Sequence, residues 1–116
     1  MITVYGIKNC DTMKRALKWL DENGISYDLH DYKKSGAPAT LIKSWEKQLD
    51  WTELLNRRGT TWRKISTDVQ ATITREKAIQ LMSDQPSLIK RPILDISGKL
   101  LCGFDPEIWA KALQIQ

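Results

Sequence analysis

The N-terminal part of the chain runs from a strand through a polar loop into an amphipathic helix, and this order restricts the folds open to it. Residues 2–5 are strand-like and mostly apolar, and Gly6 ends them. Apolar positions from Met13 to Leu20 then recur at helical spacing, and Gly24 supplies a left-handed cap. Ile25 to Tyr32 alternates apolar with polar residues, which is typical of a second strand. The order and the length of the crossover predict a parallel βαβ unit.

Cys10 lies in the loop between the first strand and the helix, a position that favours a reactive thiolate. The first turn of a helix presents unpaired N–H groups and the positive end of the helix dipole, which both stabilise a charged cysteine. Lys8, Lys14 and Arg15 are close in sequence and act in the same direction. The alternative is a buried structural cysteine. Because the residues around Cys10 are polar, the sequence favours the reactive thiol.

Length and charge limit the class of protein. A chain of 116 residues is expected to form one domain, residues 1–116. No apolar run approaches the ~20 residues of a membrane span, and no signal-type segment is visible, so we expect a cytoplasmic protein without membrane contact. The net charge of +4 suits an anionic small molecule or an acidic partner. The densest basic cluster, residues 57–64, is typical of a solvated or ligand-facing loop, and we expect no nucleic-acid binding.

The few metal-ligating side chains argue against a bound metal. Cys10 and Cys102 are far apart, neither belongs to a CxxC pair, and His30 is the single histidine. We therefore expect no metal and no bound cofactor. Cys102 follows Leu100 and Leu101 in an apolar segment, which favours core packing over a role as a resolving thiol.

Helical patterns alone occupy the middle of the chain, from about residue 36 to residue 85. This segment is predicted to be a helical insertion. Within it, residues 51–56 should form a helix that begins after an Asp50 cap, and Gly59 is well placed to end that helix.

Two apolar runs near the C-terminus predict an antiparallel hairpin. They cover residues 93–96 and 100–104, and Ser97-Gly98 forms the turn between them. Asp105 and Pro106 are typical of a helix start. The last helix is predicted to turn its apolar residues inward: Ile108, Trp109, Ala112 and Leu113.

The assembled order is β-α-β, helical insertion, β-β-α, which predicts an α/β protein with a thioredoxin-like fold and a four-stranded mixed sheet. A cysteine at the first βα junction fits this fold. Pro92 opens the third strand, where such folds carry a cis-proline beside the active cysteine, and we expect the cis form. The alternative for Pro92 is an ordinary trans-proline at a strand start.

Three separated motifs resemble one known family. They are Y-G-I-K-N-C-D-T at residues 5–12, L-L-N-R-R-G-T-T-W-R-K at residues 54–64 and I-K-R-P-I at residues 89–93. Together they resemble the arsenate reductase (ArsC)-like family of thioredoxin-fold proteins, and more narrowly its YffB branch, which is related to the Spx regulators. The resemblance implies that Cys10 is the catalytic nucleophile. It also implies that Arg91 is one of three arginines that hold the oxyanion and lower the cysteine pKa.

The other two arginines of arsenate reductases do not transfer. One falls on Asn56, with Arg57 and Arg58 adjacent as substitutes, and the other falls on Gly103. Arsenate is a compact polyanion whose binding calls for several charge-assisted contacts. Arsenate reduction with glutathione and glutaredoxin is therefore an alternative function and not the preferred one.

The preferred hypothesis is an oxidoreductase, a glutathione-dependent thiol reductase that uses one cysteine in monothiol exchange. Cys10 and Arg91 are the predicted catalytic residues. The predicted substrate-binding residues are Asn9, Thr12, Arg57, Arg58 and Pro92. Glutathione would be the co-substrate, glutaredoxin is a second candidate partner, and the substrate would be a disulfide or a small oxyanion.

A regulator of the Spx type is the third hypothesis. Many Spx proteins carry a CxxC redox switch and bind RNA polymerase, whereas the run Cys10 to Met13 has no second cysteine. That switch cannot form here, and we do not expect binding to RNA polymerase.

Overall fold

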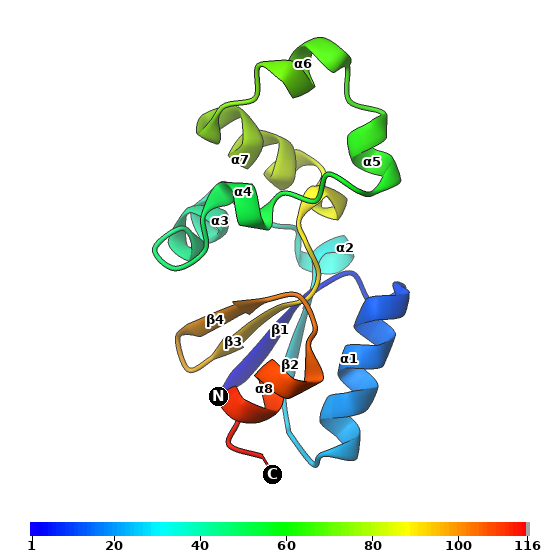
Figure 1. Ribbon diagram of the computed structural model, residues 1–116, viewed down its shortest axis with the longest axis vertical. Coiled ribbons are helices and arrows are strands. Elements are labelled where there is room, and N and C mark those ends of the chain that lie inside the picture. The colour runs from blue at the N-terminus through cyan, green and yellow to red at the C-terminus, as the bar shows by residue number, and fades with distance from the viewer. Residues whose placement is uncertain (116) are drawn as a thin grey trace. The chain divides into compact units, whose positions relative to one another are not determined.

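The computed structural model describes residues 1–115, which fall into two compact units (Figure 1). Unit 1 combines Met1–Asp31 with the segment that starts at Arg91, and unit 2 is Tyr32–Lys90. The elements of unit 1 are β1 (Ile2–Gly6), α1 (Asp11–Glu22), β2 (Asp28–Asp31), β3 (Ile93–Ile96), β4 (Lys99–Cys102) and α8 (Pro106–Ala112). Those of unit 2 are α2 (Tyr32–Ser35), α3 (Ala39–Trp45), α4 (Trp51–Leu54), α5 (Thr60–Arg63), α6 (Thr67–Ala71), α7 (Arg75–Asp84) and the 3₁₀ turn η1 (Pro86–Leu88).

Unit 1 contains a four-stranded mixed sheet with the order β2-β1-β3-β4 (Figure 1). β1 pairs in parallel with β2, opposing Val4 to Leu29, and antiparallel with β3, opposing Val4 to Leu94. β3 and β4 form the predicted antiparallel hairpin, with Ser97 and Gly98 at positive φ in its turn. The predicted α/β thioredoxin-like fold with a four-stranded mixed sheet is confirmed.

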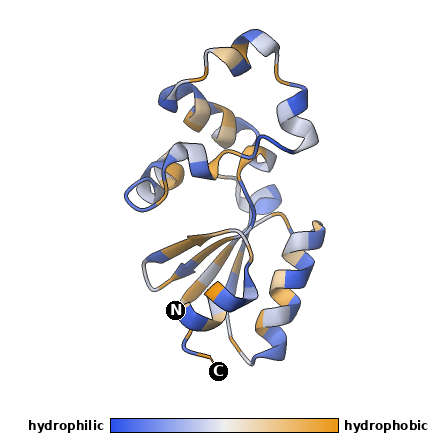
Figure 2. Ribbon diagram, in the orientation of Figure 1, coloured by the Kyte–Doolittle hydropathy of each residue, from blue (hydrophilic) through white to orange (hydrophobic). Residues whose placement is uncertain are grey.

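One face of this sheet carries the core of unit 1. Met13, Ala16 and Leu20 lie on one side of α1, as the helical spacing predicts, and are fully buried. They pack with Val4 and Leu94 of the sheet and with Trp109 of α8. Figure 2 shows hydrophobic and hydrophilic residues alternating along α1. α1 is thereby fixed against β1, which sets where the N-terminus of the helix lies.

The second strand is shorter than its alternating pattern suggests. β2 covers only Asp28–Asp31, because these are the residues that β1 opposes, and Tyr32 begins α2 as a buried residue. Ile25 donates its N–H to Leu20 and belongs to the connection that closes α1. The prediction of a strand over Ile25 to Tyr32 is therefore wrong at both ends.

Gly59 does not end the helix that Asp50 starts. Asp50 caps α4 as predicted, accepting a hydrogen bond from the N–H of Thr52. α4 nevertheless ends at Leu54, since Leu55 turns extended and bridges to Ile89. Gly59, at a φ of −82°, is instead the N-cap of α5. Pairing with a distant segment shortened the helix, and local periodicity cannot show such a partner.

In α8 the predicted Asp105 cap is confirmed, whereas the predicted inward orientation of Ile108 is wrong. The Asp105 carboxylate accepts hydrogen bonds from the N–H groups of Glu107 and Ile108, so the predicted cap is present. Trp109 is 1% exposed, whereas Ile108 is 53% exposed and does not face inward. A seven-residue helix buries a single narrow face, and Trp109 occupies it.

Across residues 1–115, every helix is too short or too polar to cross a bilayer.

Candidate active site

Cys10 is the N-cap residue of α1. Its backbone is extended, with φ −145° and ψ 136°, and its carbonyl accepts the N–H of Lys14 at 2.9 Å, the first hydrogen bond of the helix. The partly buried sulfur faces the backbone N–H groups of Thr12 and Met13. The geometry falls short of a cap hydrogen bond for a neutral thiol. The same N–H groups do stabilise a thiolate, because an anion attracts helix N-terminal donors more strongly.

Arg91, which is far from Cys10 in the sequence, acts on the same sulfur. Its side chain donates a hydrogen bond to Cys10. The Arg91–Pro92 peptide bond is cis, as predicted, and Pro92 is buried. The Pro92 carbonyl accepts the N–H of Gly103 at 2.8 Å, which ties this segment to the chain after β4. Unit 1 alone therefore brings together the predicted nucleophile, its cation and the proline segment.

The surroundings of Cys10 lower the pKa of its thiol. Burial by itself raises the pKa, because it disfavours the charged form. The Met13 N–H, the hydrogen bond from Arg91, the Thr12 N–H and the positive charge of Arg91 act in the opposite direction and together outweigh burial. A lowered pKa means that a larger fraction of Cys10 is thiolate at neutral pH.

Other predicted contributors belong to the loop and to the first turns of α1. Asn9 is exposed beside Cys10 in the loop. Thr12 acts through its backbone N–H. Lys8, Lys14 and Arg15 are exposed on the loop and α1, and the sequence-based expectation that they lower the Cys10 pKa is not met, because none of them is among the groups that shift it. Arg91 is the cation that acts on the sulfur in the described part of the chain.

Arg57 and Arg58 belong to unit 2 and are described within that unit alone. Both are exposed. The Arg57 guanidinium lies over the Trp62 ring, 5.7 Å from its centroid, and the Arg58 N–H bonds to the side chain of Asn56. Their role in substrate binding remains a prediction.

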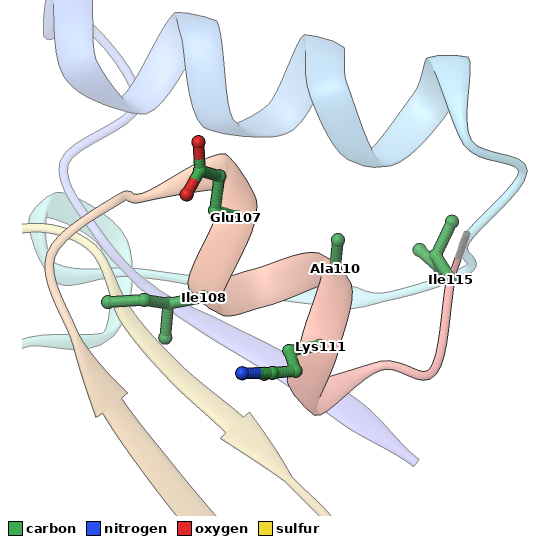
Figure 3. Close-up of a pocket in the computed structure, with 5 residues that line it drawn as sticks. All are labelled: Glu107, Ile108, Ala110, Lys111 and Ile115. Carbon is green, nitrogen blue, oxygen red and sulfur yellow. The ribbon is translucent and has the colours of Figure 1, made fainter.

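Cys102 and a hollow on α8 are not among the groups that act on the Cys10 sulfur. Cys102, at the end of β4, opposes Ile93 and is partly buried. The hollow has a volume of about 420 Å³ and is lined by Glu107, Ile108, Ala110, Lys111 and Ile115 (Figure 3). Neither cysteine lines it. Among residues 1–115, no three His, Cys, Asp or Glu side chains gather as a metal site.

Sequence reasoning missed the part played by Met13. Its N–H has the largest lowering effect on the Cys10 pKa, although its side chain looked like core packing only. Counting from the N-cap would have found it, because a capping side chain faces the N–H groups two and three positions on.

Replacing Arg91 with glutamine is expected to raise the Cys10 pKa, because the substitution removes both a charge-assisted hydrogen bond and a positive charge. Arg91→Lys should raise it less, since the charge remains. The pKa is measured from the pH dependence of alkylation by iodoacetamide. Lys14→Gln removes an equal charge from exposed surface and should leave the value in place. Equal shifts in the Arg91 and Lys14 variants would contradict the assignment.

Comparison with known proteins shows similarity over nearly the whole chain. The model of the ArsC family matches residues 5–112. A solved structure named YFFB protein is 47% identical with a TM-score of 0.92, over 97% of this chain and 99% of its own. That of an arsenate reductase (ArsC) related protein from Brucella melitensis is 46% identical with a TM-score of 0.78, over 98% and 95%. The global transcriptional regulator Spx of Staphylococcus saprophyticus is 24% identical over 92% of this chain and 82% of its own.

Proposed function

This chain belongs to the ArsC family, and from that premise we propose that it is a thiol reductase in which Cys10 exchanges with disulfides and glutathione is the reductant. The observation that supports the proposal is the lowered pKa of Cys10. Two backbone N–H groups and Arg91 cause this lowering because they stabilise the thiolate. A thiolate, and not a thiol, is the nucleophile in disulfide exchange.

The proposed reaction has two exchange steps. The Cys10 thiolate attacks the glutathione sulfur of a mixed disulfide, the S–S bond breaks, and the substrate sulfur leaves as a thiolate that takes up a proton. Cys10 is then joined to glutathione. A second glutathione thiolate attacks this disulfide, forms oxidised glutathione and returns Cys10 to its thiolate. In the net reaction the mixed disulfide and one free glutathione become the substrate thiol and oxidised glutathione: the substrate sulfur is reduced, the sulfur of the free glutathione is oxidised, and the glutathione already bound to the substrate keeps its oxidation state.

An external reductant follows from the residues around Cys10. The positions after it are Asp11, Thr12 and Met13, so no second cysteine of a CxxC pair can resolve the intermediate. Glutathione is anionic overall, and Arg91 offers it a positive charge at the sulfur. Glutaredoxin is a second candidate for the resolving thiol.

The remaining site residues have proposed binding roles. Asn9 is exposed and directly precedes Cys10 in the chain, and it would contact a bound thiol substrate. The backbone next to Pro92 would pair with the glutathione peptide. Arg57 and Arg58, which are exposed in unit 2, are proposed to bind an anionic substrate.

Arsenate reduction is the second candidate, and family membership favours it. The charge of the site argues against it. Within unit 1 the arginines are Arg15, which is exposed on α1, and Arg91. Arsenate would need charge-assisted contacts beyond the single one from Arg91.

The deciding experiment gives the reduced protein a synthetic peptide that carries a glutathione mixed disulfide. Without free glutathione, intact-mass analysis should find one glutathione on Cys10. With free glutathione, the peptide should be reduced faster than by glutathione alone. Absence of both results would overturn the proposal. A parallel assay supplies arsenate, glutathione and glutaredoxin, and faster turnover of arsenate than of the peptide would replace disulfide exchange with arsenate reduction.

A further inference from the structure

Gly6, the last residue of β1, occupies a position with no room for a side chain. A Cβ built on Gly6 would lie 2.5 Å from Sδ and 2.7 Å from Cε of Met13, well inside any real contact. The glycines at positive φ in the described chain are Gly24, Gly36, Gly98 and Gly103, so Gly6 is not there for an unusual backbone conformation. What the position requires is space for the thioether of Met13.

Met13 has little freedom to move aside. Its side chain is fully buried and packs in the core cluster of unit 1, which includes Val4, Leu94 and Trp109. Close-packed cores take up extra atoms only by shifting side chains or backbone. The new Cβ would displace the end of the methionine side chain within this core. The first turn of α1 has exposed positions, so it is the part of this packing that can shift in response.

Met13 also faces the Cys10 sulfur through its backbone N–H. The same residue thus fills the space over Gly6 with its side chain and presents a donor to the nucleophile with its main chain. A displacement of a few tenths of an ångström at Met13 would move that donor relative to the sulfur.

We propose that Gly6 is a positioning residue for the nucleophile: by leaving space for Met13, it lets the first turn of α1 approach β1 closely enough to present its N–H groups to Cys10. In this proposal Gly6 acts through Met13. The catalytic consequence rests on the proposed function, but the positioning itself can be measured on the thiol without any substrate.

The test is a double-mutant cycle on the Cys10 pKa, measured by the pH dependence of iodoacetamide alkylation. The four proteins are the wild type, Gly6→Ala, Met13→Ala and the double variant. Gly6→Ala should raise the pKa on the order of half a unit, since one helix donor is withdrawn. In the Met13→Ala background the same substitution should cause no shift, because the thioether that the new Cβ would meet is gone. Arg91, the charged group that acts on Cys10, is present in all four proteins.

Equal shifts in both backgrounds, or no shift in a folded Gly6→Ala protein, would overturn the inference. If Gly6→Ala alone does not fold, the comparison of Met13→Ala with the double variant decides. Two folded proteins with equal pKa values support the contact, whereas unequal values or an unfolded double variant refute it. Val4→Ala is the matched control, because it weakens the same face of β1 without adding a Cβ against Met13. It should lower stability and leave the pKa in place.

The outcome is separate from that of the proposed function. The cycle reports on the thiol alone, while the glutathione experiment reports on exchange by the wild type. A coupled cycle with no glutathione on Cys10 would retain the positioning role of Gly6 and reject the reductase.

Discussion

Cys10→Ser is expected to abolish glutathione-dependent reduction of the mixed-disulfide peptide, with a rate lower on the order of 10³-fold or more, as is usual when a nucleophile is removed. A serine hydroxyl keeps the position and the neighbouring N–H groups but is not ionised at neutral pH, and the Arg91 side chain cannot change that. The rate is followed by chromatography of the released peptide, with the reaction of glutathione alone subtracted.

Cys102→Ser is the matched control for this prediction. It removes the other sulfur of the chain, on β4, and should keep most of the activity and still acquire one glutathione on Cys10. A loss as large as that of Cys10→Ser would mean that Cys102 resolves the intermediate. The monothiol scheme would then have to be given up.

Trp109→Ala should be the most destabilising single substitution of those considered, at about 3–5 kcal/mol. The ring is 1% exposed and lies edge-on to Phe104, with ring centroids 4.9 Å apart, and to Trp19 at 6.1 Å. Its Nε1–H donates to the Gly103 carbonyl at 3.0 Å. The substitution therefore leaves a large cavity between α1, α8 and the sheet and removes a donor from the segment that follows β4.

Two further variants separate the contributions of the ring, of its hydrogen bond and of the helix surface to the cost of Trp109→Ala. Trp109→Phe keeps an aromatic ring and loses the donor, so its cost should be much smaller than that of alanine. Ile108→Ala changes an exposed residue of the same helix and should alter stability by about 0.5 kcal/mol or less. The free energies come from urea unfolding followed by circular dichroism. A cost below about 1 kcal/mol for Trp109→Ala would contradict the assigned core.

The parts of the fold that the sequence predicts correctly are those decided by neighbouring residues. Asp50 and Asp105 cap helices because their own carboxylates reach the next N–H groups, and Ser97-Gly98 turns because the pair tolerates positive φ. The ends of β2 and α4 depend on pairing with residues that are distant in the sequence. β1 limits β2 to the residues that it opposes, and Ile89 draws Leu55 out of the helix.

The same division holds at the site. Cys10, Arg91 and Pro92 are visible as motif residues in the sequence, and unit 1 brings them into one region. The helical spacing predicts that the Met13 side chain lies in the core, and this is correct. The spacing does not show that the backbone N–H of the same residue faces the Cys10 sulfur. The need for glycine at Gly6 depends on where the Met13 thioether lies, which only the packed structure shows.

The groups that lower the Cys10 pKa come from two parts of the sequence that are far apart. The N–H groups of Thr12 and Met13 belong to α1, whereas Arg91 stands just before β3. If the segment before β3 opens locally, the sulfur loses its guanidinium while the N–H groups of α1 stay in place. Such an opening should raise the Cys10 pKa and lower the thiolate fraction, so the reactivity of the thiol reports on the folded state of unit 1.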